Sequence, residues 1–179
     1  GVAAAIVWCA VSDARLRARL RRGCEAGEDV RAAVDAVAEK YGLKACRTVA
    51  VPGLKGAFVC GIIRPVLAVP EGEAPDGKII LHELLHLKHL DALQNVFWCV
   101  LRALHWCNPF MQYVFDRVGN DMESLCDQRV LERLEGEERR EYGAILLGMA
   151  SPADARAPGT SSISNGAKKI ARPIQAITR

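Results

Sequence analysis

Two histidines, His82 and His86, are separated by the spacing H-E-x-x-H, and this pattern limits the possible folds more than any other part of the sequence. Residues four apart stack on one face of a helix, where both imidazole rings can reach a single metal ion. Glu83 lies about 100° round the same helix, close enough to hold a water molecule on that metal. The pattern is typical of zinc peptidases, so we predict His82 and His86 as zinc ligands and Glu83 as the general base. The alternative is a pair of hydrogen-bonded histidines on a partly exposed face.

A catalytic zinc site needs a third protein ligand. One known extension of the motif requires glycine at position 89 and histidine at position 92, but this chain has His89 and Ala92. A glutamate from a later helix is the other common solution, and Glu123 is followed four residues later by Asp127 on the same helical face. We predict Glu123 as the third ligand, and Asp127 as the acceptor for the outer N–H of a zinc-bound histidine. His89 is a competing ligand that this set makes unnecessary, and an ordinary solvated carboxylate is the alternative for Glu123.

His105 and Tyr113 are the candidates for stabilising negative charge in the transition state, with aromatic packing as the alternative. Both come from residues 92–115, an apolar and aromatic region that contains one full charge, Arg102. Pro109 and several polar residues interrupt this region, so a single membrane span is not expected. The pattern favours a hydrophobic helical hairpin, either in the core or at a membrane interface.

The remaining patterns predict an α+β fold that is mostly helical and has a small β-sheet. Helices are predicted over 28–41, from Asp76 into the low nineties, from Pro109 to about residue 135, and over about 137–150. Strands are predicted over 45–51 and 57–69, with the second broken near Gly61 and Pro65.

Basic charge is concentrated at the two ends of the chain. Residues 12–22 and 151–179 each carry a net charge of +4, and the residues between them carry −5. An acidic middle is a poor footprint for nucleic acid, so no direct nucleic-acid partner is expected. Residues 1–11 are unbroken apolar but too short to cross a bilayer alone. Because an arginine-rich segment follows them, we expect the end of a transmembrane helix there, with a buried helix as the alternative.

These patterns divide the chain into four regions. We expect the end of a transmembrane helix over 1–11, a basic juxtamembrane segment over 12–27, a zinc metallopeptidase domain over 28–150, and a loop with a basic tail over 151–179 that leads to a further membrane helix. The chain has seven cysteines and no C-x-x-C pair. This number and spacing predict free thiols in a reducing compartment rather than a disulfide framework or a thiolate zinc site.

Several segments together resemble the BlaR/MecR-type antirepressor peptidases, which are integral-membrane gluzincins of bacteria. They are HELLHLKHLD (82–91), WCNPF (106–110), DMESLCD (121–127) and GAKKIARPI (166–174), with GLKACRTVAV and GIIRPVLAVP before them. The resemblance implies zinc ligation by His82, His86 and Glu123, with Glu83 as the base. It also implies a gluzincin-like domain excised from an integral-membrane protein, lying on the cytosolic side of a bacterial cell membrane.

The resemblance further implies a zinc endopeptidase of membrane signal transduction that regulates antibiotic resistance. Its expected substrate is a protein or peptide, such as a transcriptional repressor or another cytosolic regulator, or the chain itself. Residues 156–166 lack a periodic apolar pattern and are tethered near the site, which favours a self-cleavage or autoinhibitory segment; a passive linker is the equal alternative. The alternative function is a non-catalytic, zinc-stabilised membrane sensor or scaffold, although such a protein has no need of Glu83.

Overall fold

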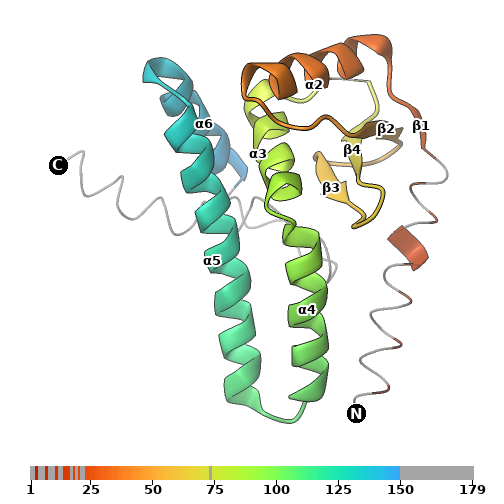
Figure 1. The fold of residues 1–179 in the computed structure, drawn as a ribbon, viewed down its shortest axis with the longest axis vertical. Helices are drawn as coiled ribbons and strands as arrows, with labels where there is room; N and C mark the ends of the chain where they lie inside the picture. The colour runs from red at the N-terminus through yellow and green to blue at the C-terminus, as the bar shows by residue number, and fades with distance from the viewer. Residues whose placement is uncertain are drawn as a thin grey trace.

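A computed structural model describes residues 23–72 and 74–149, together with positions 3, 7, 11, 14–16, 18 and 20. The predicted loop and basic tail over 151–179 lie outside the described residues, as does most of the segment 1–22. Among the described residues, no helix is both long and apolar enough to cross a membrane. The predicted α+β class, mostly helical with a small sheet, is confirmed (Figure 1).

The sheet has four strands in the order β1-β2-β4-β3. Their bounds are Cys24–Glu25 for β1, Arg47–Val51 for β2, Phe58–Cys60 for β3 and Val66–Pro70 for β4. The two central strands, β2 and β4, are parallel, and each edge strand is antiparallel to its neighbour. The predicted break near Gly61 and Pro65 separates β3 from β4. The sequence did not indicate β1, because two residues are too few to form a periodic pattern.

Five helices complete the described fold. They are α2 (Glu28–Lys40), α3 (Gly77–Lys88), α4 (Asp91–Leu104), α5 (Pro109–Arg133) and α6 (Gly136–Met149). Two predicted N-caps are present: Asp76 accepts from the backbone N–H of Lys78, and Asn108 accepts from that of Phe110. Such caps satisfy amide groups that have no partner within the helix. They explain why α3 and α5 begin where the sequence predicts.

Leu90 interrupts the helix that the sequence predicts from Asp76 into the low nineties. Its φ is +55°, in the left-handed region, so α3 ends at Lys88 and α4 begins at Asp91. A residue with a Cβ rarely adopts this conformation, so the surrounding contacts must hold it. The prediction of one continuous helix is wrong here. In a continuous helix Asp91 would lie about 140° round from His86, whereas the break turns the two side chains toward each other.

Helix α3 lies at the centre of the described fold, and every residue from Ile80 to His86 is buried. One side of the helix packs on the sheet and α2, through Ile80 and Leu84. The other side packs on α5 and α6, through Leu81 and Leu85. Figure 1 shows α3 between the sheet and the α5–α6 pair. The motif that dominates the sequence is therefore carried by the most enclosed helix.

A core truncation tests this arrangement. Leu67 on β4 is 0% exposed and packs against α2 and α3. Leu67→Ala should lower the free energy of unfolding by about 2–5 kcal/mol, because it removes buried contacts and leaves a cavity. Urea unfolding followed by circular dichroism measures this change. The matched control is Ile63→Ala, at a position that is 92% exposed, which should change stability by no more than about 0.5 kcal/mol.

Candidate metal centre

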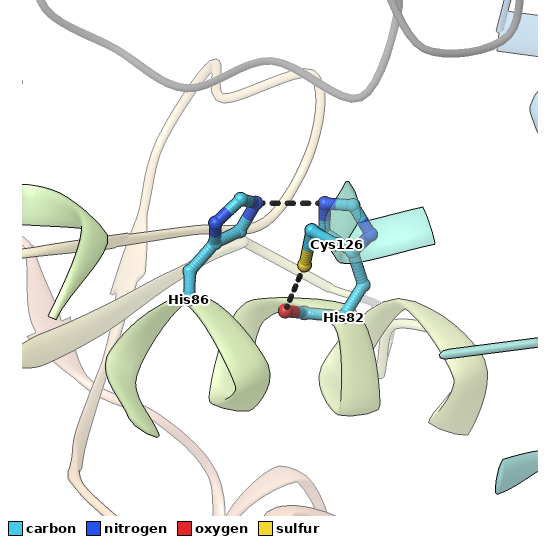
Figure 2. Close-up of side chains that lie close together, drawn as sticks. All are labelled: His82, His86 and Cys126. Carbon is cyan, nitrogen blue, oxygen red and sulfur yellow. Dashed lines mark hydrogen bonds between the residues drawn. The ribbon is translucent and has the colours of Figure 1, made fainter. Parts of the chain in front are cut away.

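The Nε2 atoms of His82 and His86 face each other at 2.9 Å, and both imidazoles are buried (Figure 2). The two rings meet nearly edge to face, with their centroids 4.6 Å apart. Both side chains rise from one face of α3, as their spacing of four residues predicts. Two nitrogen atoms that can act as ligands are thus brought together inside the protein.

The outer nitrogen of each ring has its own partner on another helix. His86 Nδ1 donates to Asp91 Oδ2 at 2.6 Å, at the start of α4. His82 Nδ1 donates to the Tyr142 hydroxyl at 2.8 Å and lies 3.2 Å from Asp127 Oδ1. Because Tyr142 itself donates to Asp127 Oδ1 at 2.8 Å, its oxygen is free to accept from His82. These bonds place the proton of a neutral ring on Nδ1 and leave a lone pair on Nε2, the state that a metal ligand needs.

Glu123 reaches the same point from α5. Its Oε2 lies 3.8 Å from His82 Nε2 and 3.7 Å from His86 Nε2. This oxygen is buried and has no hydrogen-bond partner among the residues that the structure describes. A buried carboxylate oxygen without a partner is costly, because it loses its hydration without compensation. A cation between the three atoms would remove this cost.

The carboxylates around His82 and His86 favour positive charge on or between the two imidazole rings. Burial lowers the pKa of both imidazoles, but hydrogen bonds to Asp127 on His82 and to Asp91 on His86 outweigh it, and both pKa values are raised. Burial also raises the pKa of Glu123, yet its interaction with His82 and His86 brings that pKa down to about 2. An ionised carboxylate and two polarised imidazoles therefore surround one small volume.

Cys126 brings a sulfur atom close to the histidine pair. It is fully buried, and its thiol donates to the backbone oxygen of His82 at 3.5 Å (Figure 2). Possible ligand atoms of His82, His86 and Cys126 all lie within 4.8 Å of one another. The sequence predicts Cys126 only as one of several free thiols, and its closeness to these nitrogens is a finding of the structure.

Glu83 lies beside the histidines and is held in place by a hydrogen bond from the sheet. Its Oε2 accepts the backbone N–H of Val59, on edge strand β3, at 2.8 Å. The side chain is buried, and burial raises its pKa, with His82 and His86 acting in the opposite direction. A carboxyl group with a raised pKa can both accept and release a proton near neutral pH.

These atoms fit a zinc ion. Two imidazole nitrogens and one carboxylate oxygen form a ligand set known for catalytic zinc, which leaves a fourth position for water. The fit rests on two observations: the facing Nε2 atoms of His82 and His86, and the buried Oε2 of Glu123, which has no hydrogen-bond partner among the described residues. The outer bonds to Asp91 and Asp127 are of the kind that orient zinc-bound histidines.

The structure brings Glu83, Glu123 and Asp127 to the histidine pair but does not bring His105 or Tyr113 there. His105 ends α4, a helix of 14 residues that starts at Asp91, so it lies roughly 20 Å along that helix from the site. Its Nδ1 bonds the backbone oxygen of Leu101 at 2.9 Å. Tyr113 is exposed and lies ten residues before Glu123 on α5, about 15 Å along the axis.

Two residues of the centre, Asp91 and Tyr142, were not predicted from the sequence. Asp91 carried no signal, because its contact depends on the chain break at Leu90. Tyr142 lies 60 residues after His82, and nothing in its local pattern separates it from an ordinary core tyrosine. One general signal does point to them. A buried metal-binding histidine needs a hydrogen-bond partner for its outer nitrogen, and the sequence predicts only one such partner, Asp127, for two histidines.

A histidine pair, a neighbouring glutamate and a glutamate from a later helix form an arrangement that is also typical of H-E-x-x-H peptidases. The family described as BlaR1 peptidase M56 matches residues 1–177. The chain therefore belongs to the BlaR1 peptidase M56 family, in agreement with the resemblance noted from its motifs.

Two kinds of relatives are similar to part of this chain. Regulatory protein BlaR1 of Bacillus licheniformis is 34% identical over 105 residues, which is 56% of this chain and 18% of that protein. The methicillin resistance mecR1 protein of Staphylococcus aureus is 38% identical over 69 residues, which is 38% of this chain and 12% of that protein. The mecR1 protein of Staphylococcus epidermidis gives the same values. The matched segments span less than a fifth of the length of these relatives.

Tyr142→Phe tests the hydroxyl that joins His82 to Asp127. Burial, with the negative charge of Asp127, raises the pKa of Tyr142, so the hydroxyl keeps its proton. Its removal takes a donor from a buried carboxylate and should cost about 1–3 kcal/mol of stability. Urea unfolding in the presence of a chelator measures this cost separately from metal binding. Tyr113→Phe, at an exposed position, is the matched control and should leave stability unchanged; equal stability of both variants would contradict the role of the hydroxyl.

Proposed function

We propose that this chain is the zinc endopeptidase domain of a bacterial membrane signal transducer. The observation that carries the proposal is the meeting of His82 Nε2, His86 Nε2 and the partnerless Glu123 Oε2 beside a buried Glu83. Membership of a peptidase family supports the same reaction class.

His82, His86 and Glu123 would hold the zinc ion, and Asp91, Asp127 and Tyr142 would fix the orientation of the two imidazoles. When bound, zinc polarises a peptide carbonyl and lowers the pKa of a water molecule, so that a nucleophile is available at neutral pH. The three ligand side chains come from two helices, α3 and α5, whose packing fixes their separation. The buried surroundings strengthen each electrostatic interaction.

Glu83 moves the proton. The N–H of Val59 holds Oε2 of Glu83 in place, which leaves Oε1 to take a proton from the attacking water. The same carboxyl group then gives this proton to the amine of the leaving peptide, so the carboxylate is restored when the C–N bond has broken. A pKa raised by burial suits both steps, because the group must accept and then release one proton.

The substrate we propose is an extended segment of a regulatory protein or of the chain itself. Relatives named regulatory protein BlaR1 and methicillin resistance mecR1 protein support a role in regulating antibiotic resistance. We place the domain on the cytosolic side of the membrane, where a transcriptional repressor is accessible. Residues 156–166 are the proposed self-cleavage or autoinhibitory segment, since a tether to the domain gives them a high effective concentration at the site.

A non-catalytic, zinc-stabilised sensor is the second candidate, and Cys126 favours it. Its sulfur lies near both histidines, and a fourth protein ligand would close the site as in structural zinc centres. The presence of Glu83 favours the peptidase, because a closed structural site has no use for a general base. The thiol is also engaged by the His82 backbone oxygen, whereas Glu123 Oε2 has no partner among the described residues.

The zinc content of two variants separates these candidates. Glu123→Ala should abolish most zinc binding, because it removes the third ligand. Cys126→Ser should retain one zinc ion per chain, because the thiol is not a ligand of the catalytic centre. Atomic absorption on the purified chain, after dialysis against a weak chelator, measures both. Loss of zinc in both variants would make Cys126 a fourth ligand and favour the closed site, whereas full zinc in Glu123→Ala would overturn Glu123 as the third ligand.

Glu83→Gln tests catalysis. The amide keeps the size of the side chain but cannot take a proton, so zinc content should be unchanged and peptide cleavage should fall at least about 100-fold. The purified chain is incubated with zinc and a generic unfolded protein, and new termini are mapped by mass spectrometry. Termini within 156–166 that arise in the wild type and not in Glu83→Gln would establish self-cleavage. Identical fragments from both chains would mean that the domain is not the peptidase.

A further inference from the structure

Helices α4 and α5 form a hairpin whose outer surface is apolar. Figure 1 shows α4 beside the first half of α5, with both projecting away from the sheet. Eight large apolar or aromatic side chains on this hairpin are between 49% and 70% exposed: Leu93, Val96, Phe97, Val100, Leu104, Trp106, Phe110 and Tyr113. We call these side chains the hairpin surface. An apolar patch of this kind on a folded domain marks an interaction site.

Several polar groups near the turn of the hairpin are paired within it. Arg102 donates to Gln112 Oε1 at 2.7 Å and pairs with Asp116 at 2.9 Å. Gln112 in turn donates to the backbone oxygens of Arg102 and His105 at the end of α4. Asn108 accepts from the first N–H groups of α5. These bonds satisfy part of both helix ends, which lowers the cost of placing the turn in a lipid environment.

We propose that this hairpin inserts into the lipid–water interface of an anionic membrane, with the hairpin surface facing the acyl chains. The aromatic residues at the tip support an interfacial position, because tryptophan and tyrosine favour the level of the lipid headgroups. The proposal is independent of the zinc chemistry, since the hairpin tip lies at the far end of α4 from the metal centre.

The length of α4 and the low charge of the hairpin favour lipid, rather than a protein, as the partner of the hairpin surface. Helix α4 has 14 residues and is therefore about 21 Å long, too short for a hydrocarbon core of about 30 Å, so the hairpin can enter one leaflet only. Residues 92–115 contain one full charge, Arg102, and Asp116 neutralises it. A protein partner needs matching polar contacts at the rim of an interface, whereas a lipid surface does not.

The same chain carries positive charge suited to anionic headgroups. Residues 12–22, which lead into β1, contain five arginines and one aspartate. Clusters of arginine attract the negative surface of a membrane and act additively with buried apolar side chains. Membrane attachment generally needs two such signals, and the hairpin surface would supply the apolar one.

Fluorescence of a single tryptophan tests the insertion. The chain has three tryptophans, and Trp8→Phe with Trp98→Phe leaves Trp106 as the only reporter. Vesicles of phosphatidylcholine and phosphatidylglycerol should shift its emission to the blue, and brominated acyl chains should quench it. When Val100→Ser and Leu104→Ser are introduced into this reporter chain, the partition coefficient should fall at least about tenfold, because two apolar side chains no longer enter the lipid. Zinc content should not change.

The control variant replaces exposed apolar residues elsewhere, with Ile63→Ser and Leu147→Ser, and should bind vesicles like the parent chain. Circular dichroism checks that every variant is folded. Vesicle binding without quenching of Trp106 would assign binding to other segments and overturn the proposal. A blue shift of Trp106 without vesicles, accompanied by a dimer in light scattering that Val100→Ser and Leu104→Ser abolish, would identify a second copy as the occupant and also overturn it.

Discussion

The described fold depends on satisfying three buried polar side chains of its central helix. His82, Glu83 and His86 lie on α3 among apolar residues, and each needs a hydrogen-bond partner because its side chain is buried. The partners come from four directions: Asp91 on α4, Asp127 on α5, Tyr142 on α6 and the Val59 amide on β3. Four elements around α3 thus contribute a contact to the centre, so the packing of these elements also fixes the geometry of the site.

Helix α4 has two separate tasks in this arrangement. Its first residue, Asp91, holds the ring of His86, and this requires the left-handed backbone at Leu90. Its remaining length carries the exposed apolar stripe of the hairpin, braced against α5 by Trp98 on Phe115 and by Arg102 on Asp116. A strained residue at the junction is consistent with a position where function, rather than helix stability, decides the conformation.

The site contains more carboxylates than the one that the proposed zinc ligand set needs. Three carboxylates, Asp91, Glu123 and Asp127, surround two imidazoles, and Glu83 lies beside them. Such a site is stable only when a cation or protons balance it, which is why the absence of a partner for Glu123 Oε2 among the described residues is informative. A bound zinc ion would supply this balancing charge, as expected for a member of a peptidase family. The thiol of Cys126 lies close enough that its role as a ligand is a question for experiment.

The sequence by itself determined the local features: the α+β class, the helix starts at Asp76 and Asn108, and the candidate set His82, Glu83, His86, Glu123 and Asp127. Each of these depends on residues a few positions apart, where helical spacing and capping are decisive. Only the tertiary structure decided the break at Leu90, the bond of Asp91 to His86 and that of Tyr142 to His82, and the distant position of His105. These depend on how helices pack against one another, and residue spacing within one helix carries no information about the neighbour that it will meet.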